Sequence, residues 1–305
     1  MTRRGILPIG VVVALCGVVA CLDREPSVTN IPGEPPSNAD PWPNQPAAFR
    51  AFAENDFSRP MVATPSATGL RGSWSTQIID GDNTYVRSVN APKSPPSVFQ
   101  GRLPAGMIPG YSAIKWEGWD SASDADNCGT EMSRVYLSLW VKLPGADYEN
   151  QAVGTKMGFF AYGEPKTGGG NQGVLFLKGL GTGHGLANAW NVQFKQQGSG
   201  PPRDADQNVT QSKLMTVGSW HRWEVLLQLN DTGQANGVFK WWIDGTLVLD
   251  YEDWTYITSS NPLGFYTFRF WPYWGGVGGE NKTRDDYIQV DHIYISGIPK
   301  TSKAW

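Results

Sequence analysis

Short runs in which apolar and polar residues alternate dominate the chain between residues 57 and 299. The clearest run spans residues 190–195, where Trp190, Val192 and Phe194 alternate with polar residues. Successive side chains of a β-strand point to opposite faces of a sheet, so this alternation predicts a strand with one buried face. Comparable runs predict further strands at residues 136–143, 221–229, 237–243, 246–251, 264–274 and 287–296.

Glycine, proline and asparagine separate these runs. Asp244-Gly245 stands between two apolar runs, and this dipeptide is the strongest short signal for a β-hairpin. Residues 47–55 favour a short helix or an irregular lead-in, and residues 212–217 favour a short helix. Many short strands with turn residues between them predict an all-β sandwich or barrel.

The first twenty residues have the features of a signal peptide. Arg3 and Arg4 precede an apolar run, residues 6–20, that is too short to span a bilayer as a helix. The run ends in Val-Val-Ala-Cys at residues 18–21, which resembles the lipobox of bacterial lipoprotein precursors. The resemblance implies cleavage before Cys21 and lipidation of its thiol. An ordinary secretory signal followed by a chance cysteine is the alternative.

We therefore expect a signal peptide at residues 1–20, a disordered tether at 21–46 and a folded domain at 47–305. The tether segment is rich in proline, asparagine, serine and acidic residues and has no apolar period. Attachment through Cys21 places the domain in the bacterial cell envelope, exported and held to the membrane by the lipid alone. Leu22 and Asp23 lack the usual signal for inner-membrane retention, which favours the outer membrane.

The composition of the chain limits the kinds of partner and cofactor that it can bind. The net charge is −3 and only 17% of residues are charged, so the chain lacks the basic field that binding to nucleic acid requires. With Cys16 in the signal peptide and Cys21 lipidated, Cys128 has no cysteine to pair with and is expected to be a bystander thiol. One cysteine and three scattered histidines form no zinc motif. We expect a monomer without a cofactor, although Asp285-Asp286 or Asp80-Gly81-Asp82 could contribute to a structural calcium site.

The C-terminal half of the domain carries a resemblance. The stretch WHRWEVLLQLNDTGQANGVFKWWIDGTLVLDYEDW, followed by GFYTFRFWPYWGG, resembles concanavalin A-like jelly-roll proteins, and among these the β-sandwich polysaccharide lyases of the alginate and glucuronan lyase type. KMGFFAYG and GLGTGHGLANAWNVQFK fit the strands in the middle of such domains more loosely. The positions that match are Trp223, Asn230, Gly233, Trp242, Asp244, Gly245, Trp274, Gly275 and Gly276. The resemblance covers about residues 60–299 and implies a jelly-roll sandwich with a concave groove that holds a polysaccharide.

Alternation within residues 264–274 indicates which residues line that groove. It places Tyr266, Phe268 and Phe270 on a core face, and Thr267, Arg269, Trp271 and Tyr273 on the opposite face. Aromatic rings stack on sugars and arginine binds carboxylates with two hydrogen bonds, so the second face suits an acidic polysaccharide. By the same alternation the groove gains Lys156, Phe160, Tyr162, Asn191, Gln193 and Lys195. An ordinary solvated sheet face is the alternative.

The carboxylates do not suit a glycoside hydrolase, which needs two carboxyl groups about 5–10 Å apart. Jelly-roll glucanases carry theirs on one strand as Glu-x-Asp-x-Glu, and this chain has no such run. Glu117, Glu131 and Glu224 are isolated, while the adjacent Glu252 and Asp253 are expected to face opposite ways. Hydrolysis by that route is therefore disfavoured.

β-Elimination on a uronate needs a group that neutralises the carboxylate, a base for the C5 proton and an acid for the leaving oxygen. The resemblance implies tyrosine, histidine or lysine in the last two roles. The candidates are Arg269 and Gln193 as neutralising groups, Tyr273, Tyr266 or Tyr162 as acid or base, and Lys195 or His184 as auxiliaries. His184, in a glycine-rich loop, is either catalytic or merely exposed, whereas His221 and His292 are expected to be structural. The residues expected to contact the sugar are Trp271, Tyr162, Lys156, Asn191 and Tyr266.

The sequence therefore favours a surface protein that binds an acidic polysaccharide and cleaves it by β-elimination. A lectin-like module with the same face but no acid–base pair is the first alternative. The second is a structural surface protein, for which Trp271 and Tyr273 should be buried beneath other segments.

Overall fold

The computed structural model contains fifteen β-strands and no helix within the residues that it describes. These are residues 42–59, 70–72, 74–78, 83–88, 90–120, 131–145, 148–149, 155–163, 172–180, 189–197, 215–256, 263–275 and 278–300. No helix in this part of the chain is long and apolar enough to cross a membrane. The expected all-β class is confirmed.

Eight strands form the first sheet, which we call sheet A. Its order is β3–β4–β15–β6–β11–β12–β13, and β1 pairs with the C-terminal half of β15. All of these pairs are antiparallel. The strands are β1 (Arg50–Asn55), β3 (Asn83–Arg87), β4 (Ser97–Leu103), β6 (Met132–Lys142), β11 (Trp220–Gln228), β12 (Gly237–Ile243), β13 (Thr246–Trp254) and β15 (Asp286–Pro299).

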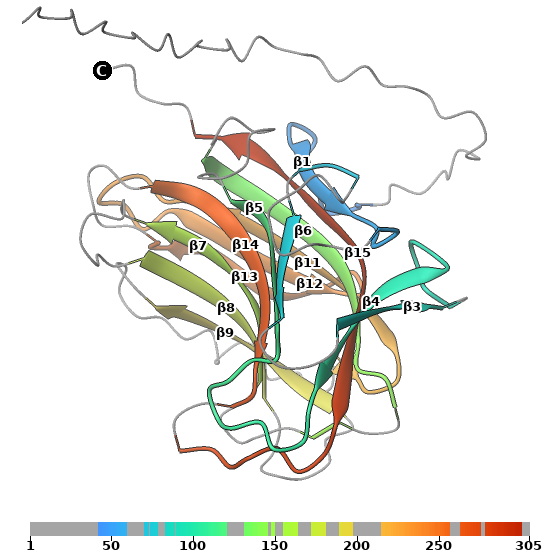
Figure 1. Cartoon of the computed structure of the whole chain (residues 1–305). Helices are drawn as coiled ribbons and strands as arrows, with labels where there is room; N and C mark the ends of the chain where they lie inside the picture. The colour runs from blue at the N-terminus through green and yellow to red at the C-terminus, as the bar shows by residue number, and fades with distance from the viewer. Residues whose placement is uncertain are drawn as a thin grey trace, which may run out of the picture. The chain divides into compact units, whose positions relative to one another are not determined.

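The other seven strands form sheet B in the order β2–β5–β14–β7–β8–β9–β10. Figure 1 shows β7, β8, β9 and β14 side by side in front of the strands of sheet A. The pair Phe265–Met132 between β14 and β6 joins the two sheets. The strands are β2 (Trp74–Ile78), β5 (Ile114–Asp120), β7 (Thr155–Gly163), β8 (Gln172–Leu180), β9 (Ala189–Gln197), β10 (Met215–Thr216) and β14 (Leu263–Tyr273).

A core rich in aromatic residues fills the space between the sheets. Trp116 of β5 stacks on Phe270 of β14 with ring centroids 4.7 Å apart and also touches Phe268. On sheet A, Trp223 and Trp241 meet edge to face at 5.2 Å. Buried aromatic side chains remove about 150–250 Å² each from water, so these contacts account for much of the stability of the sandwich.

The outer face of sheet A is partly covered by the segment that precedes β1. Trp42 stacks on Tyr294 of β15 with centroids 4.4 Å apart, and the Asn44 N–H donates to the Glu224 carboxylate at 3.3 Å. Residues 42–46, which the sequence assigned to the tether, thus pack against the sheet. A short helix or an irregular lead-in was expected at residues 47–55, and neither describes residues 50–55. Residues 50–55 form β1 because they pair with β15, as in Ala51–Ser296, and tertiary pairing overrides local helix propensity.

The predicted hairpin is confirmed. β12 and β13 are joined by Asp244 (φ 50°) and Gly245 (φ 80°), the left-handed pair that a type I′ turn requires. The Asp244 carboxylate accepts a hydrogen bond from the Arg222 N–H at 2.8 Å and pairs with the His221 ring at 2.6 Å.

The second expected helix, at residues 212–217, is also wrong in its described part. Met215 and Thr216 form the short strand β10, which pairs with β9.

Candidate functional site

The alternation predicted for β14 holds from Phe268 onward. Phe268 and Phe270 belong to the core, whereas Arg269 and Trp271 between and beyond them are partly exposed. A purely structural protein should bury Trp271 beneath other segments. The partial exposure of Trp271 does not agree with that alternative. Arg269 and Trp271 lie on the face of sheet B that points away from the core.

Tyr266 does not share the face of Phe268 and Phe270. Phe265 takes the core position, and Tyr266, although only 7% exposed, is not part of the core cluster. The register of β14 slips against β5 between Thr267 and Phe268, and a bulge of this kind reverses the alternation. The Tyr266 hydroxyl is buried, so it offers no accessible acid or base and no surface for a sugar.

The register brings Arg269 and Lys195 into one cross-strand row. Directly paired residues share a face of an antiparallel sheet, and three strand spacings separate these two, about 14 Å. The full row is Ser75, Glu117, Arg269, Phe159, Phe176 and Lys195.

A second row lies toward the C-terminal end of β14. It contains three of the predicted residues together with one lysine that the sequence analysis missed, in the order Tyr273, Lys156, Lys178 and Gln193. Asn191 pairs with Leu180, two residues further along β9. The sheet thus places Tyr273, Lys156 and Gln193 in register with one another, one row from Arg269.

Two predicted placements differ from this arrangement. Phe160 pairs with the core residue Phe268, whereas Phe159 pairs with Arg269. Phe160 is therefore one residue out of register with the row of Arg269, in which it was expected. Tyr162 pairs with Gly173, away from both rows. The side chains of β7, β8, β9 and Tyr273, and all of His184, lie outside the described residues.

Sequence reasoning missed Glu117 and Lys178, which are the register partners of Arg269 and Lys156. The strand at β5 carried a usable signal, since Ile114, Trp116 and Gly118 alternate with longer polar or aromatic residues. Lys178 follows the apolar run of residues 174–177, a pattern that does not by itself separate a strand from a loop.

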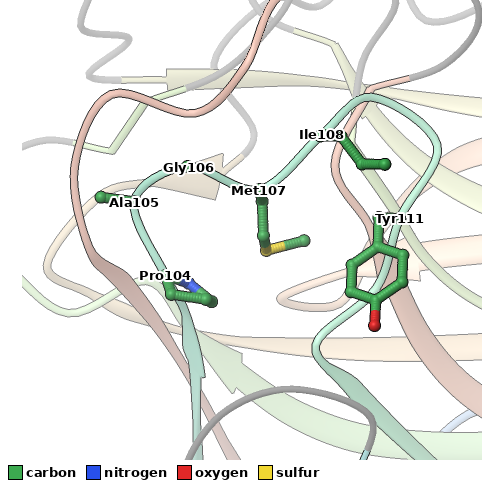
Figure 2. Close-up of a pocket in the computed structure, with 6 residues that line it drawn as sticks. All are labelled: Pro104, Ala105, Gly106, Met107, Ile108 and Tyr111. Atoms are coloured by element: carbon green, nitrogen blue, oxygen red, sulfur yellow. The ribbon is translucent and has the colours of Figure 1, made fainter.

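A small pocket adjoins the C-terminal end of β14. The β4–β5 loop pairs with this end through the Trp274 N–H, which donates to the Tyr111 carbonyl at 2.8 Å, and through the Gly110 N–H, which donates to the Trp274 carbonyl at 2.7 Å. Figure 2 shows the pocket, whose volume is about 300 Å³. Its lining residues are Pro104, Ala105, Gly106, Met107, Ile108 and Tyr111.

A buried ion cluster supports the same end of β14. The Lys282 ammonium group, fully buried, donates to Glu149 at 3.1 Å and Asp286 at 2.5 Å and lies 4.3 Å from the Trp274 ring centroid. Burial raises the pKa of Asp286, although Lys282 opposes this shift. Burial also acts to raise the pKa of Glu149, but the hydrogen bonds from Lys282 and Thr283, together with the charge of Lys282, outweigh it and the pKa is lowered.

The candidate calcium ligands do not fit a cation where they are described. The Asp286 carboxylate forms an ion pair with Lys282. The Asp285 carboxylate accepts a hydrogen bond from the Ala105 N–H at 2.8 Å and forms an ion pair with Arg102 at 3.5 Å. No group of three potential metal-ligating side chains occurs in the described ranges. Asp80 and Asp82 lie outside these ranges.

His221 and His292 have structural roles, as predicted. His221 is buried; its Nδ1 pairs with Asp244 at 2.6 Å, and its Nε2 accepts from the Thr216 N–H at 2.9 Å. His292 lies at a bulge of β15 with φ 44°, between Ser94 at 2.5 Å and Glu54 at 2.7 Å.

Hydrogen bonds link Ser94 to His292 and His292 to Glu54, the sequence of residue types found in a hydrolase triad. The backbone around the serine is not arranged for that chemistry. The N–H groups of Lys93 and Ser94 donate to the buried Asp291 carboxylate, at 2.7 and 3.2 Å. A triad needs free donors beside the serine to stabilise an oxyanion. This network instead ties β1 and the segment before β4 to β15.

Comparison with known proteins identifies the fold. No family model and no curated protein sequence matches the chain. Alginate lyase Aly36B superposes with a TM-score of 0.51 at 17% identity, covering 83% of this chain and 98% of that one. Alginate lyase vAL-1 from Chlorella virus gives 0.53 at 12% identity, covering 73% of this chain and 93% of that one.

A third similar structure is the endo-β-1,4-glucuronan lyase of the fungus Trichoderma reesei. Its TM-score is 0.50 at 15% identity, and the alignment covers 82% of this chain and 96% of that one. The chain therefore has the β-jelly-roll sandwich fold of these polysaccharide lyases, which confirms the fold that the sequence predicted. Fold at this identity does not establish activity, which has to be argued from the site.

Proposed function

We propose that the protein binds an acidic polysaccharide across the outward face of sheet B and cleaves it by β-elimination. The observation that carries this proposal is the pair of adjacent rows containing Arg269 and Lys195, and Tyr273, Lys156, Lys178 and Gln193. The strand register thus places cationic residues, a glutamine and a tyrosine in neighbouring rows of one sheet. Two of the similar structures, both double mutants of alginate lyase Aly36B, hold an alginate trisaccharide or tetrasaccharide, which supports this class of ligand.

In the proposed reaction Arg269 binds the C6 carboxylate of a uronate, with Gln193 as second donor. Neutralising that carboxylate stabilises the negative charge that develops when the C5 proton leaves. A base removes the proton, the C5–H electron pair forms the C4=C5 double bond, and the C4–O bond breaks. The leaving oxygen then takes a proton from an acid. We assign the acid–base role to Tyr273, whose anionic form the lysines of its row would stabilise, and auxiliary roles to Lys195 and His184.

The test is absorbance near 235 nm during incubation of the full chain with alginate, glucuronan and pectate, since elimination creates an unsaturated uronate. We expect a rise with at least one polymer and a loss of roughly 10²–10³-fold in kcat for Arg269→Ala. Tyr273→Phe should abolish the rise while leaving binding intact. Arg134→Ala, which alters an exposed arginine on sheet A, is the matched control and should not change the rate.

The outcomes separate the candidate functions. A flat trace with all three polymers, together with measurable binding, would exclude elimination on these substrates and leave a lectin-like module. A rise that Arg269→Ala does not diminish would place the chemistry elsewhere on the chain.

We also propose that residues 1–20 are removed and that Cys21 carries the lipid that holds the protein in the bacterial envelope. The lipobox-like Val-Val-Ala-Cys supports this. Mass spectrometry of the N-terminal peptide should find an acylated Cys21, and Cys21→Ser should release the protein from the membrane fraction. An unmodified cysteine in the mature chain would refute the anchor.

A further inference from the structure

The outer face of sheet A carries three partly exposed tryptophans: Trp140 on β6, Trp220 on β11 and Trp242 on β12. The residues that alternate with them point the other way, into the core. The segment that covers part of this sheet packs on Tyr136 and Tyr294 and reaches the Glu224 carboxylate beside Trp242, but it leaves the three indoles partly exposed. Three indoles thus lie on the side of the sandwich opposite the proposed catalytic face.

Cationic side chains lie over two of these rings. The Lys142 ammonium group is 5.8 Å from the Trp220 ring centroid, and the Arg222 guanidinium group is 5.7 Å from that of Trp140. Arg222 also pairs with the buried Glu224 at 2.9 Å. Within the described part of the chain Lys142 forms no ion pair. Its positive charge is therefore not neutralised by a neighbouring carboxylate there.

Strand register gives the spacing of the rings. Trp140 pairs with Arg222, and Lys142 pairs with Trp220, so Trp140 and Trp220 are diagonal neighbours about 8 Å apart at the backbone. Trp242 pairs with Glu224, one row further along and two strands across from Trp140, about 12 Å away. In the row of Lys142, Gln289 and Gln100 present paired amides, 2.8 Å apart.

We propose that this surface, defined by Trp140, Lys142, Trp220, Arg222 and Trp242, is a second binding site for an acidic polysaccharide, independent of the proposed catalytic site. Sugar rings present apolar C–H faces to indoles, and the cations beside the rings and the amides beyond Lys142 suit carboxylates and hydroxyls. Arg222 is paired with Glu224, so it is the charge of Lys142 that favours an acidic chain over a neutral one. Because cations separate the indoles, the surface has no continuous apolar centre of the kind that homodimer interfaces bury.

The site would act by holding the polymer while another part of it occupies sheet B. Two sites on one rigid sandwich raise the local concentration of substrate even when each binds weakly. The proposal does not rest on elimination, because it concerns the opposite sheet and predicts binding without turnover. Failure of the lyase proposal would leave it standing.

The test is affinity electrophoresis of the full chain in gels that contain alginate, glucuronan or pectate. An Arg269→Ala background weakens the sheet B contribution, and the tryptophan changes are compared within that background. We expect this variant to remain retarded by the polymer, and the addition of Trp140→Ala and Trp242→Ala to weaken binding roughly tenfold or more. Circular dichroism melts check that the triple variant is folded.

Lys142→Glu provides a second readout that removes no ring from the sheet. It should weaken binding in the same background, most strongly at low salt, whereas the matched change Lys300→Glu, made at a lysine paired with Glu131, should not. Trp140→Phe, which keeps a ring, should retain most of the binding.

Three results would overturn the proposal. The first is complete loss of retardation in Arg269→Ala alone, which would mean that one site binds the polymer. The second is unchanged binding in a folded triple variant. The third is a change of oligomeric state in the tryptophan variants, measured by light scattering, without a change in glycan binding, which would identify the face as a contact between copies of the chain.

Discussion

Replacement of Lys282 by methionine tests the buried ion cluster beneath the end of β14. Methionine fills a similar volume but removes the charge that lies between Glu149 and Asp286. Both carboxylates are less than 10% exposed, and removing one partner of a buried ion pair costs about 3–5 kcal/mol because the remaining charge is uncompensated.

Several donors remain to limit this penalty. Glu149 still accepts hydrogen bonds from the N–H and hydroxyl of Thr283 and from the Arg284 N–H, and Asp286 still accepts from the Glu149 N–H. The loss should therefore fall at the lower end of that range, about 3 kcal/mol. For a sandwich of this size each kcal/mol lowers Tm by about 2–4 °C, so the expected shift is about 6–12 °C.

Scanning calorimetry at pH 7 measures the shift, and Lys300→Met is the matched control. Lys300 forms a partly exposed pair with Glu131 at 3.7 Å, which predicts a change of at most about 1 kcal/mol. The Lys282→Met penalty should shrink as the pH falls toward about 4, because the uncompensated carboxylates become protonated. A shift no larger than that of the control, or one that does not vary with pH, would refute the assignment.

Three further predictions concern stability. Phe270→Ala removes the ring stacked on Trp116 and should cost about 3–5 kcal/mol in urea unfolding; an unchanged midpoint would contradict the packing. Gly245→Ala should cost about 1 kcal/mol and Gly245→Asn much less, because the φ of 80° is strained for a side chain while no atom lies within 3.8 Å of the added carbon. Equal costs would point to a steric cause. Glu149→Gln should destabilise the protein above about pH 4.5 and progressively less below it, since a lowered pKa contributes stability that is lost on acidification. A destabilisation that is the same at pH 3 and pH 7 would contradict this.

Local patterns predicted the parts of the fold that depend on neighbours in sequence. The Asp244-Gly245 hairpin and the alternation of Phe268 to Trp271 each rest on a few consecutive residues, and both hold in the structure. The strand β1 was mistaken for helix because its structure depends on β15, more than 230 residues later. No local pattern contains that pairing.

The site was predictable in composition but not in register. The sequence selected Arg269, Lys195 and Gln193, and the sheet places them in two adjacent rows. It missed Glu117 because the pairing of β5 with β14 joins segments about 150 residues apart. It misplaced Tyr266 because a bulge of one residue reverses the two faces of a strand, and nothing in the local sequence marks that bulge.

The partners of β15 have a consequence for how the chain reaches its native state. This strand pairs with β6 along one edge and changes from β4 to β1 along the other. Three earlier strands therefore lack one of their partners until β15, the last of the described strands along the chain, is available. Closing such long loops slows folding. The sandwich stays incompletely paired until β15 has been synthesised, and truncation before Asp286 would leave the edges of β1, β4 and β6 open to pairing with other chains.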